Sequence, residues 1–237
     1  MRTSSGILWG MEILTAKELL GPLNDVETKY APTQLYVAGD KELLKQSPRV
    51  AVVGSRKASQ GALSRTTKLV EKLVREQAII VSGLAMGIDT AAHRAAIRSG
   101  GRTIAVLGTP LDVVTPSANR ELQHLIMREH LAVSQFPAGT TVRPHFFPIR
   151  NRTMALICQT SVIIEAGDGS GTLSQGWEAL RLGRSLFIAE EVVNDAALTW
   201  PAEMLDYGAR VLGDDVDELL ETLPAPGSGI NIVQNAF

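Results

Sequence analysis

The strongest constraint on the fold is a series of short apolar segments that alternate with amphipathic helical segments from residue 49 onward. Each short segment is apolar throughout, which is typical of strands buried on both faces of a parallel sheet. We therefore predict an α/β fold with a doubly wound, mostly parallel sheet of the extended Rossmann-like type. The predicted strands are VAVV at 50–53, AIIVS at 78–82, TIAVL at 103–107, LAVS at 131–134, SVIIE at 161–165 and SLFIA at 185–189.

The same pattern divides the chain into three parts. We expect the Rossmann-like core to span residues 49–223 and to end in a helix, a strand and an acidic helix after Thr199. Residues 1–48 are predicted to be a lead-in packed on the core, with a helical stretch at Thr15–Leu20 and a small strand at Gln34–Val37. Residues 224–237 contain Gly, Pro and Ser, and we expect a flexible tail there.

Several functional classes are disfavoured by composition. No apolar run approaches the roughly 20 residues of a membrane span, and the N-terminus lacks a signal-peptide hydrophobic region, so we expect a cytoplasmic protein without membrane partners. The single cysteine, Cys158, excludes an intramolecular disulfide and is expected to be a buried small hydrophobic residue. Four histidines and one cysteine show no ligand spacing, so no metal site is expected.

Charge is distributed unevenly along the chain, although the formal net charge is only −2. Residues 49–152 contain fifteen Lys and Arg against six Asp and Glu, whereas residues 153–237 contain three against thirteen. Solvated helix faces of opposite sign would explain this distribution. The alternative is a basic face for a polyanion, backed by an acidic C-terminal third.

Glycine and small polar residues follow the predicted strands, as in Gly54-Ser55-Arg56 and the loop Glu165–Thr172. Strand-to-helix turns use glycine for positive φ even without a ligand. However, the carboxyl ends of parallel strands share one edge, so these turns and Arg56 are also predicted to form an anion site. The predicted phosphate or nucleotide rim consists of Gly54, Ser55, Ser82, Gly83, Gly108, Ser170, Gly171 and Thr172.

The segment from Phe146 to Thr172 combines aromatic, cationic and small residues. We expect Arg150, Asn151 and Arg152 to begin a helix, where free backbone N–H groups and two guanidiniums would meet an anion. Adjacent residues of an extended segment face opposite ways, so one of Phe146 and Phe147 should be packed and the other presented at the rim.

Other nucleotide and catalytic motifs are weaker. Gly54–Ser59 lacks the Walker A frame, and the glycines at 167–171 lack the GxGxxG spacing of a dinucleotide site, so no cofactor is expected. Asp89 and His93 are spaced i, i+4 on a predicted helix. They could form a general-base pair, but a structural pair in which His93 ties the helix to the sheet edge is favoured, and no catalytic residue is assigned.

Five motifs in order resemble the DNA-processing protein A family (DprA, also called Smf): VAVVGSRKAS, VSGLAMGIDTAAH, TIAVLGTPLDVVTPSAN, FPIRNR and IIEAGDGSGTL. With the similar upstream segment APTQLYVAGDKELL, the resemblance covers roughly residues 22–190. It implies an extended Rossmann core that forms a homodimer, binds single-stranded DNA without sequence specificity, and loads a RecA-type recombinase onto DNA taken up in transformation. The family is not known as an enzyme.

The resemblance also implies which residues line the DNA pocket. Arg56 and the arginines of RNR would contact phosphates, and a phenylalanine before the proline would stack on a base. By the family's motif we expect Phe147, next to Pro148, to be the packed ring and Phe146 to lie at the rim. The predicted DNA-binding set is Arg56, Arg143, Phe146, Phe147, Arg150, Asn151 and Arg152.

Two alternatives use the same rim. Arg152-Thr153-Met154 and the Gly-x-Gly-Thr sequence at 169–172 also resemble the LOG nucleotide phosphoribohydrolases. In that alignment the catalytic glutamate falls on Gln175, whose amide cannot act as a general acid or base, and Glu178 lies one turn further along. The second alternative is a nucleotide sensor without turnover.

Overall fold

The apolar segments pair into one nine-stranded sheet in the computed structural model, which describes residues 10–46 and 48–225. The strand order is β1-β2-β6-β5-β4-β3-β7-β8-β9. β2 runs antiparallel to β1 and β6, and the remaining pairings are parallel. The strands are β1 (Glu12–Leu14), β2 (Leu35–Gly39), β3 (Arg49–Val53), β4 (Ile79–Ser82), β5 (Thr103–Leu107), β6 (Leu131–Ser134), β7 (Thr160–Ile163), β8 (Ser185–Ala189) and β9 (Arg210–Leu212).

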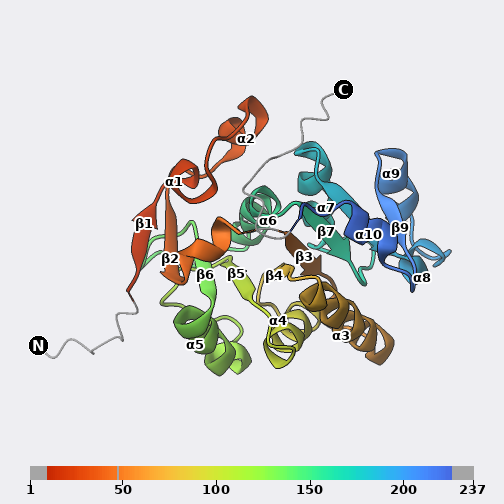
Figure 1. The fold of residues 1–237 in the computed structure, drawn as a ribbon, viewed down its shortest axis with the longest axis horizontal. Helices are drawn as coiled ribbons and strands as arrows, with labels where there is room; N and C mark the ends of the chain where they lie inside the picture. Colours follow the sequence, from red (N-terminus) through yellow and green to blue (C-terminus); the bar gives the residue numbers. More distant parts are fainter. Residues whose placement is uncertain (1–9, 47, 226–237) are drawn as a thin grey trace, which may run out of the picture.

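Helices cover both faces of this sheet, which confirms the predicted doubly wound α/β class (Figure 1). One face carries α3 (Gln60–Arg75), α4 (Ile88–Arg98) and α5 (Arg120–Glu129), and the other carries α6 (Phe146–Ile157) and α7 (Leu173–Arg181). The shorter helices are α1 (Ala16–Leu20), α2 (Asp25–Tyr30), α8 (Glu190–Val193), α9 (Trp200–Asp206) and α10 (Asp217–Glu221), with 3₁₀ turns η1 (Lys41–Leu44) and η2 (Ser117–Asn119). Among the described residues, no helix is long and apolar enough to span a membrane.

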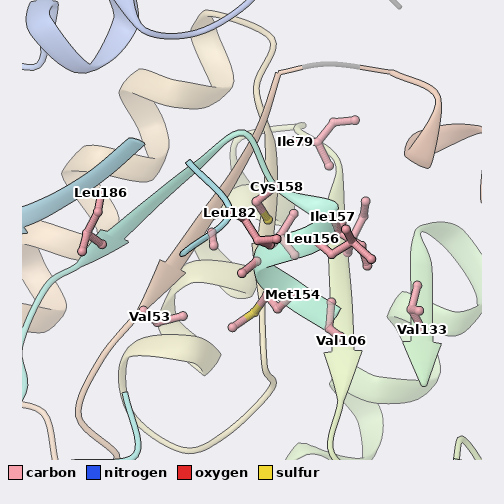
Figure 2. Packing of buried hydrophobic residues seen from close by; sticks show 14 of the residues in the cluster. Val53, Ile79, Val106, Val133, Met154, Leu156, Ile157, Cys158, Leu182 and Leu186 are labelled. Atoms are coloured by element: carbon pink, nitrogen blue, oxygen red, sulfur yellow. The ribbon is translucent and has the colours of Figure 1, made fainter. Parts of the chain in front are cut away.

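Alternate residues of the central strands enter separate hydrophobic layers. In β3, Ala51 and Val53 pack in the layer that contains the apolar residues of α6, whereas Val50 and Val52 pack against α3 and α4. Figure 2 shows the α6 side of the core, where Met154 and Cys158 lie among aliphatic side chains of the strands. Cys158 is buried, as predicted, and burial raises the pKa of its thiol to about 12.

The six predicted core strands are all present. The largest difference is at β7, which ends at Ile163 rather than at Glu165. The predicted helical stretch Thr15–Leu20 is α1, whose N-cap Thr15 and N3 residue Glu18 form a reciprocal capping box. The predicted strand Gln34–Val37 is β2, shifted by one residue at its start. β1 was not predicted, and most of the predicted tail, residues 226–237, lies outside the described residues.

The strand order changes direction at β3. The chain proceeds from β3 to β4, β5 and β6 on one side, and then returns to place β7, β8 and β9 on the other side. In parallel sheets, such a switch point leaves a crevice between the carboxyl ends of the two adjacent strands, and ligands bind there. Here the crevice lies between the ends of β3 and β7.

Candidate nucleic-acid interface

A cavity of about 530 Å³ lies at the switch point. Its walls come from the turn after β3, from the loop 167–172 after β7, and from the first turns of α6. This volume is within the range of small-ligand sites. A smaller cavity of about 270 Å³ lies between α3 and the ends of β8 and β9, and it is lined by none of the predicted site residues.

The N-terminus of α6 differs from the prediction. The helix begins at Phe146 rather than Arg150, because Pro148 occupies its first turn, where a missing N–H costs no helical hydrogen bond. The first N–H groups are already satisfied, since Phe146 N donates to Arg143 O at 3.0 Å and Phe147 N donates to Pro144 O at 3.3 Å. The predicted anion site at a free helix N-terminus beginning at Arg150 is therefore wrong.

Arg150 forms the inner wall of the cavity and is only 6% exposed. Its Nη1 donates to the carbonyl oxygens of Gly83 at 2.7 Å and Val106 at 2.6 Å, which joins the ends of β4 and β5. Burial lowers the pKa of this guanidinium, and the nearby Asp89 carboxylate opposes that shift. Arg150 is therefore a brace between the strands as well as a source of positive charge behind the cavity wall.

The other residues of the RNR motif point in different directions. Asn151 lines the cavity, and its Nδ2 donates to Gly171 O at 3.1 Å and Ser174 Oγ at 2.6 Å, which fixes the 167–172 loop against α6. Arg152 lies outside the cavity lining, and its Nε donates to Glu178 Oε1 at 3.3 Å. Arg150 and Arg152 therefore do not form the predicted clamp around one anion.

Arg143 is exposed in the turn before α6 and is also outside the cavity lining. It stays a predicted DNA contact.

The assignment of the two phenylalanines is reversed in the structure. Phe146 is 9% exposed and stacks on Phe136 with a centroid separation of 4.0 Å and an interplanar angle of 8°. Phe147 is half-buried and lines the cavity, with Arg56 5.5 Å from its ring centroid. The expectation that Phe147 is the packed ring and Phe146 the rim residue is therefore wrong, because helical rather than extended geometry sets their directions.

Only part of the predicted glycine rim borders the cavity. The lining residues of that set are Gly54, Ser55, Ser170, Gly171 and Thr172, and Thr172 Oγ1 donates to Gly54 O at 3.2 Å across the crevice. Ser82 is fully buried, and its Oγ donates to Val52 O at 2.7 Å. Gly83 and Gly108 are covered by the side chains of Arg150 and Phe147, so these glycines make room for protein groups rather than for a ligand.

Arg56 and Lys57 supply the exposed positive charge at the mouth of the cavity. Lys57 was not predicted as a site residue, although its position directly after Arg56 in a strand-end turn was a usable signal. Two carboxylates also line the cavity: Asp168, whose Oδ1 accepts from Thr199 N at 3.3 Å, and the buried Asp89. Burial raises the pKa of Asp89, and the charge of Arg150 opposes the shift.

Asp89 and His93 do not form the general-base pair that was the disfavoured alternative. Asp89 Oδ2 accepts from Ala85 N at 3.2 Å, whereas His93 Nδ1 lies 2.7 Å from Thr103 Oγ1. His93 thus ties α4 to β5, as the structural interpretation predicted. Burial lowers the pKa of His93 to about 3, so the ring is neutral at physiological pH.

The residues of the phosphoribohydrolase alternative lack a free carboxylate at the cavity. Gln175 borders the cavity but is fully buried, and its Nε2 donates to Ser161 Oγ at 3.1 Å. Glu178 lies outside the lining and is paired with Arg152 and Arg181. Neither residue is placed to protonate a leaving group in this cavity.

Residues 14–224 match the family described as DNA recombination-mediator protein A. This range includes every residue that lines the cavity. The chain belongs to this family. DNA processing protein DprA of Streptococcus pneumoniae is 40% identical over 191 residues, which cover 81% of this chain and 67% of the relative.

Two solved structures of the family are also similar. The X-ray structure of DprA from Streptococcus pneumoniae superposes with a TM-score of 0.76 at 36% identity, over 89% of this chain and 74% of that chain. A structure that describes the single-stranded DNA binding mode of DNA processing protein A from Helicobacter pylori superposes with a TM-score of 0.75 at 25% identity, over 91% and 96% of the two chains. The chain spans about half to two thirds of the length of the curated relatives that it matches.

Proposed function

We propose that the chain binds single-stranded DNA without sequence specificity in the switch-point cavity, and that it acts in DNA processing and recombination. One observation carries this proposal: the half-buried ring of Phe147 lies beside the exposed cations Arg56 and Lys57 in a cavity of nucleotide size. Positive groups that follow a phosphate backbone, combined with an aromatic ring that stacks on any base, are the usual basis of sequence-tolerant binding to single strands.

The polar groups of the cavity explain the lack of sequence preference. Arg150 and Asn151 donate to protein acceptors, and Gln175 is fully buried, so these side chains are not presented to read base edges. Arg56 and Lys57 remain available for phosphates, which are identical in every sequence. Discrimination between bases would instead come from stacking on Phe147, which is weakly selective.

The Helicobacter pylori protein supports DNA over a free nucleotide as the ligand, because its structure describes a single-stranded DNA binding mode on the same fold. The same kinship motivates the proposal of a homodimer, of a RecA-type recombinase as partner, and of a cytoplasmic location where such strands are processed.

The test measures fluorescence anisotropy of labelled dT oligomers over a series of salt concentrations. Each phosphate contact contributes about 0.7 to the slope of log affinity against log salt for single strands, so Arg56→Ala should lower that slope by about this amount. Arg94→Ala is the matched control, because Arg94 is exposed on α4 and does not line the cavity. Equal slopes for wild type and Arg56→Ala would refute the proposed site.

A panel of nucleoside monophosphates in the same assay separates the alternatives. Release of free base by the wild-type protein would favour the phosphoribohydrolase. Binding of one mononucleotide with no binding of dT oligomers would favour the sensor.

A further inference from the structure

Outside the cavity, three cations surround one aromatic ring on the surface where α2 meets α6 and α7. Arg152 and Arg181 each place their guanidinium carbon 5.3 Å from the ring centroid of Tyr30, and Lys29 Nζ lies 5.5 Å from it. We call Lys29, Tyr30, Arg152, Glu178 and Arg181 the Tyr30 cluster. None of these residues lines the cavity.

The guanidiniums of the Tyr30 cluster are held in place yet accessible. The side chain of Glu178 is 9% exposed and pairs with Arg152 at 3.3 Å and Arg181 at 3.2 Å, whereas the two arginine side chains are 38% and 43% exposed. One carboxylate faces three cations, so the cluster keeps a positive charge. Guanidiniums fixed by a ring and a carboxylate lose little side-chain entropy when they bind an oxyanion.

The cluster lies directly beyond the cavity along the seam between α6 and α7. At the cavity margin, Asn151 of α6 bonds to Ser174 of α7. The next bridge between these helices is Arg152 to Glu178, and Glu178 follows Ser174 by four residues, about 6 Å along the axis. A strand that leaves the cavity on this side therefore meets the Tyr30 cluster next.

We propose that the Tyr30 cluster is a second phosphate-binding position, so that bound single-stranded DNA runs from the cavity along the α6–α7 seam and over Arg152 and Arg181. The inference rests on the proposed function and names the direction in which the strand leaves. Arginine suits this task because its planar fork binds two oxygens of a phosphate at once. Three cations surround the ring of Tyr30, whereas Arg56 alone lies beside Phe147, so Tyr30 positions the arginines and does not stack on a base.

A purely structural role is the competing explanation, in which the cluster only holds α2 on the core. Arg184 and Glu27 already form a buried ion pair between α2 and the residues after α7, so α2 has a separate anchor. The two explanations differ in one measurable respect. A structural cluster affects melting temperature, whereas a phosphate site affects binding in a way that depends on the length of the strand.

The experiment compares a dT oligomer of about four nucleotides, which occupies the cavity, with one of about twelve, which reaches further. Arg181→Ala should leave the affinity for the short oligomer unchanged, weaken the long one by roughly three- to tenfold, and lower its salt slope by about 0.7. Arg181→Lys should restore part of the loss, and Arg98→Ala, an exposed cation on α4, should have no effect.

Two outcomes overturn the inference in distinguishable ways. If Arg56→Ala weakens both oligomers but Arg181→Ala binds the long one like wild type, the cavity binds DNA and the Tyr30 cluster does not. If wild type binds neither oligomer, the proposed function itself fails. Lys29→Ala removes an exposed cation beside the ring of Tyr30, so it should show a smaller loss of the same kind, and it provides the test should Arg181→Ala not fold.

Discussion

The guanidinium of Arg150 lies where any side chain at position 83 would begin: a Cβ atom built on Gly83 overlaps Nη1 of Arg150. The glycine has no positive φ, so its role is to allow close approach. Arg150 can donate to the carbonyl groups of both Gly83 and Val106 only because this space is free. The absence of a side chain at Gly83 therefore allows Arg150 to join α6 to the end of β4 and to form the wall of the cavity.

Gly83→Ala should lower the free energy of unfolding by about 1–3 kcal/mol, the usual range for overpacking a filled interior. The methyl group must displace a buried guanidinium that already has its hydrogen-bond partners. Urea denaturation measures the loss. Gly167→Ala is the control, because nothing lies within 4 Å of a Cβ at that position, and equal stabilities for the two variants would show that Arg150 is not fixed as described.

Phe146→Ala and Phe147→Ala should separate stability from binding. The stacked, buried Phe146 should cost about 3 kcal/mol or more of stability when truncated, the range for buried aromatic residues. Phe147→Ala should melt close to wild type but lose ~1–3 kcal/mol of binding free energy for single-stranded DNA, the contribution of one stacked base. Melting curves and anisotropy titrations test the pair, and the opposite pattern would restore the assignment made from the sequence.

Stability should fall with decreasing pH because of His93. Burial lowers the pKa of the folded imidazole to about 3, whereas the unfolded side chain titrates near its ordinary value of about 6.5. Between these values the unfolded chain binds a proton that the folded chain does not, so the free energy of unfolding declines by up to about 1.4 kcal/mol per pH unit as pH decreases from 6.5.

His93→Gln keeps a group that can bond to Thr103 but does not titrate, so its curve should be flatter than that of wild type. Asp89, whose pKa is raised by burial, changes stability in the opposite direction, and it is present in both proteins, so its effect cancels in the comparison. Parallel stability curves from pH 7 to 5 would mean that burial does not lower the pKa of the folded His93.

Gln175→Glu should not create a hydrolase. The new carboxylate would replace a fully buried amide that is bonded to Ser161, so we expect lower stability and weaker DNA binding but no release of base from AMP. Chromatography of the reaction mixture detects free adenine. Base release by wild type that survives Gln175→Ala but is lost in Glu178→Ala would contradict the binding-module interpretation.

The parts of the fold that are buried on both faces were predictable from the sequence. β5, β6 and β8 have the predicted bounds. A continuous apolar run of four or five residues is too short for a typical helix and fits a strand that is buried on both faces. The three-residue β1 was missed because a strand of this length, with only Ile13 and Leu14 apolar, is too short to show a periodic pattern. The start of α6 was missed because proline inside a segment predicts a break, whereas a first turn accepts it.

The composition of the site was easier to predict than its geometry. Arg56 and the loop residues 170–172 follow strand ends, and topology alone brings strand ends together. The directions of Arg150 and Arg152 depend on the helical rotation of α6 and on partners far away in sequence, Gly83 and Glu178. The local sequence does not contain those partners, so the two arginines were predicted to bind one anion together. In the structure Arg150 instead joins strand ends behind the cavity, and Arg152 lies outside the cavity.

The switch point also fixes an order of assembly. Val50 of β3 pairs with Ile80 on one edge and with Thr160 on the other, so during synthesis β4, β5 and β6 are available long before β7. Until then one edge of β3 has unpaired backbone groups, which are a template for incorrect pairing with other chains. The cavity closes only when β7 reaches that edge, so a nascent or truncated chain that ends before β7 has an unprotected strand edge and lacks the wall that the 167–172 loop gives the cavity.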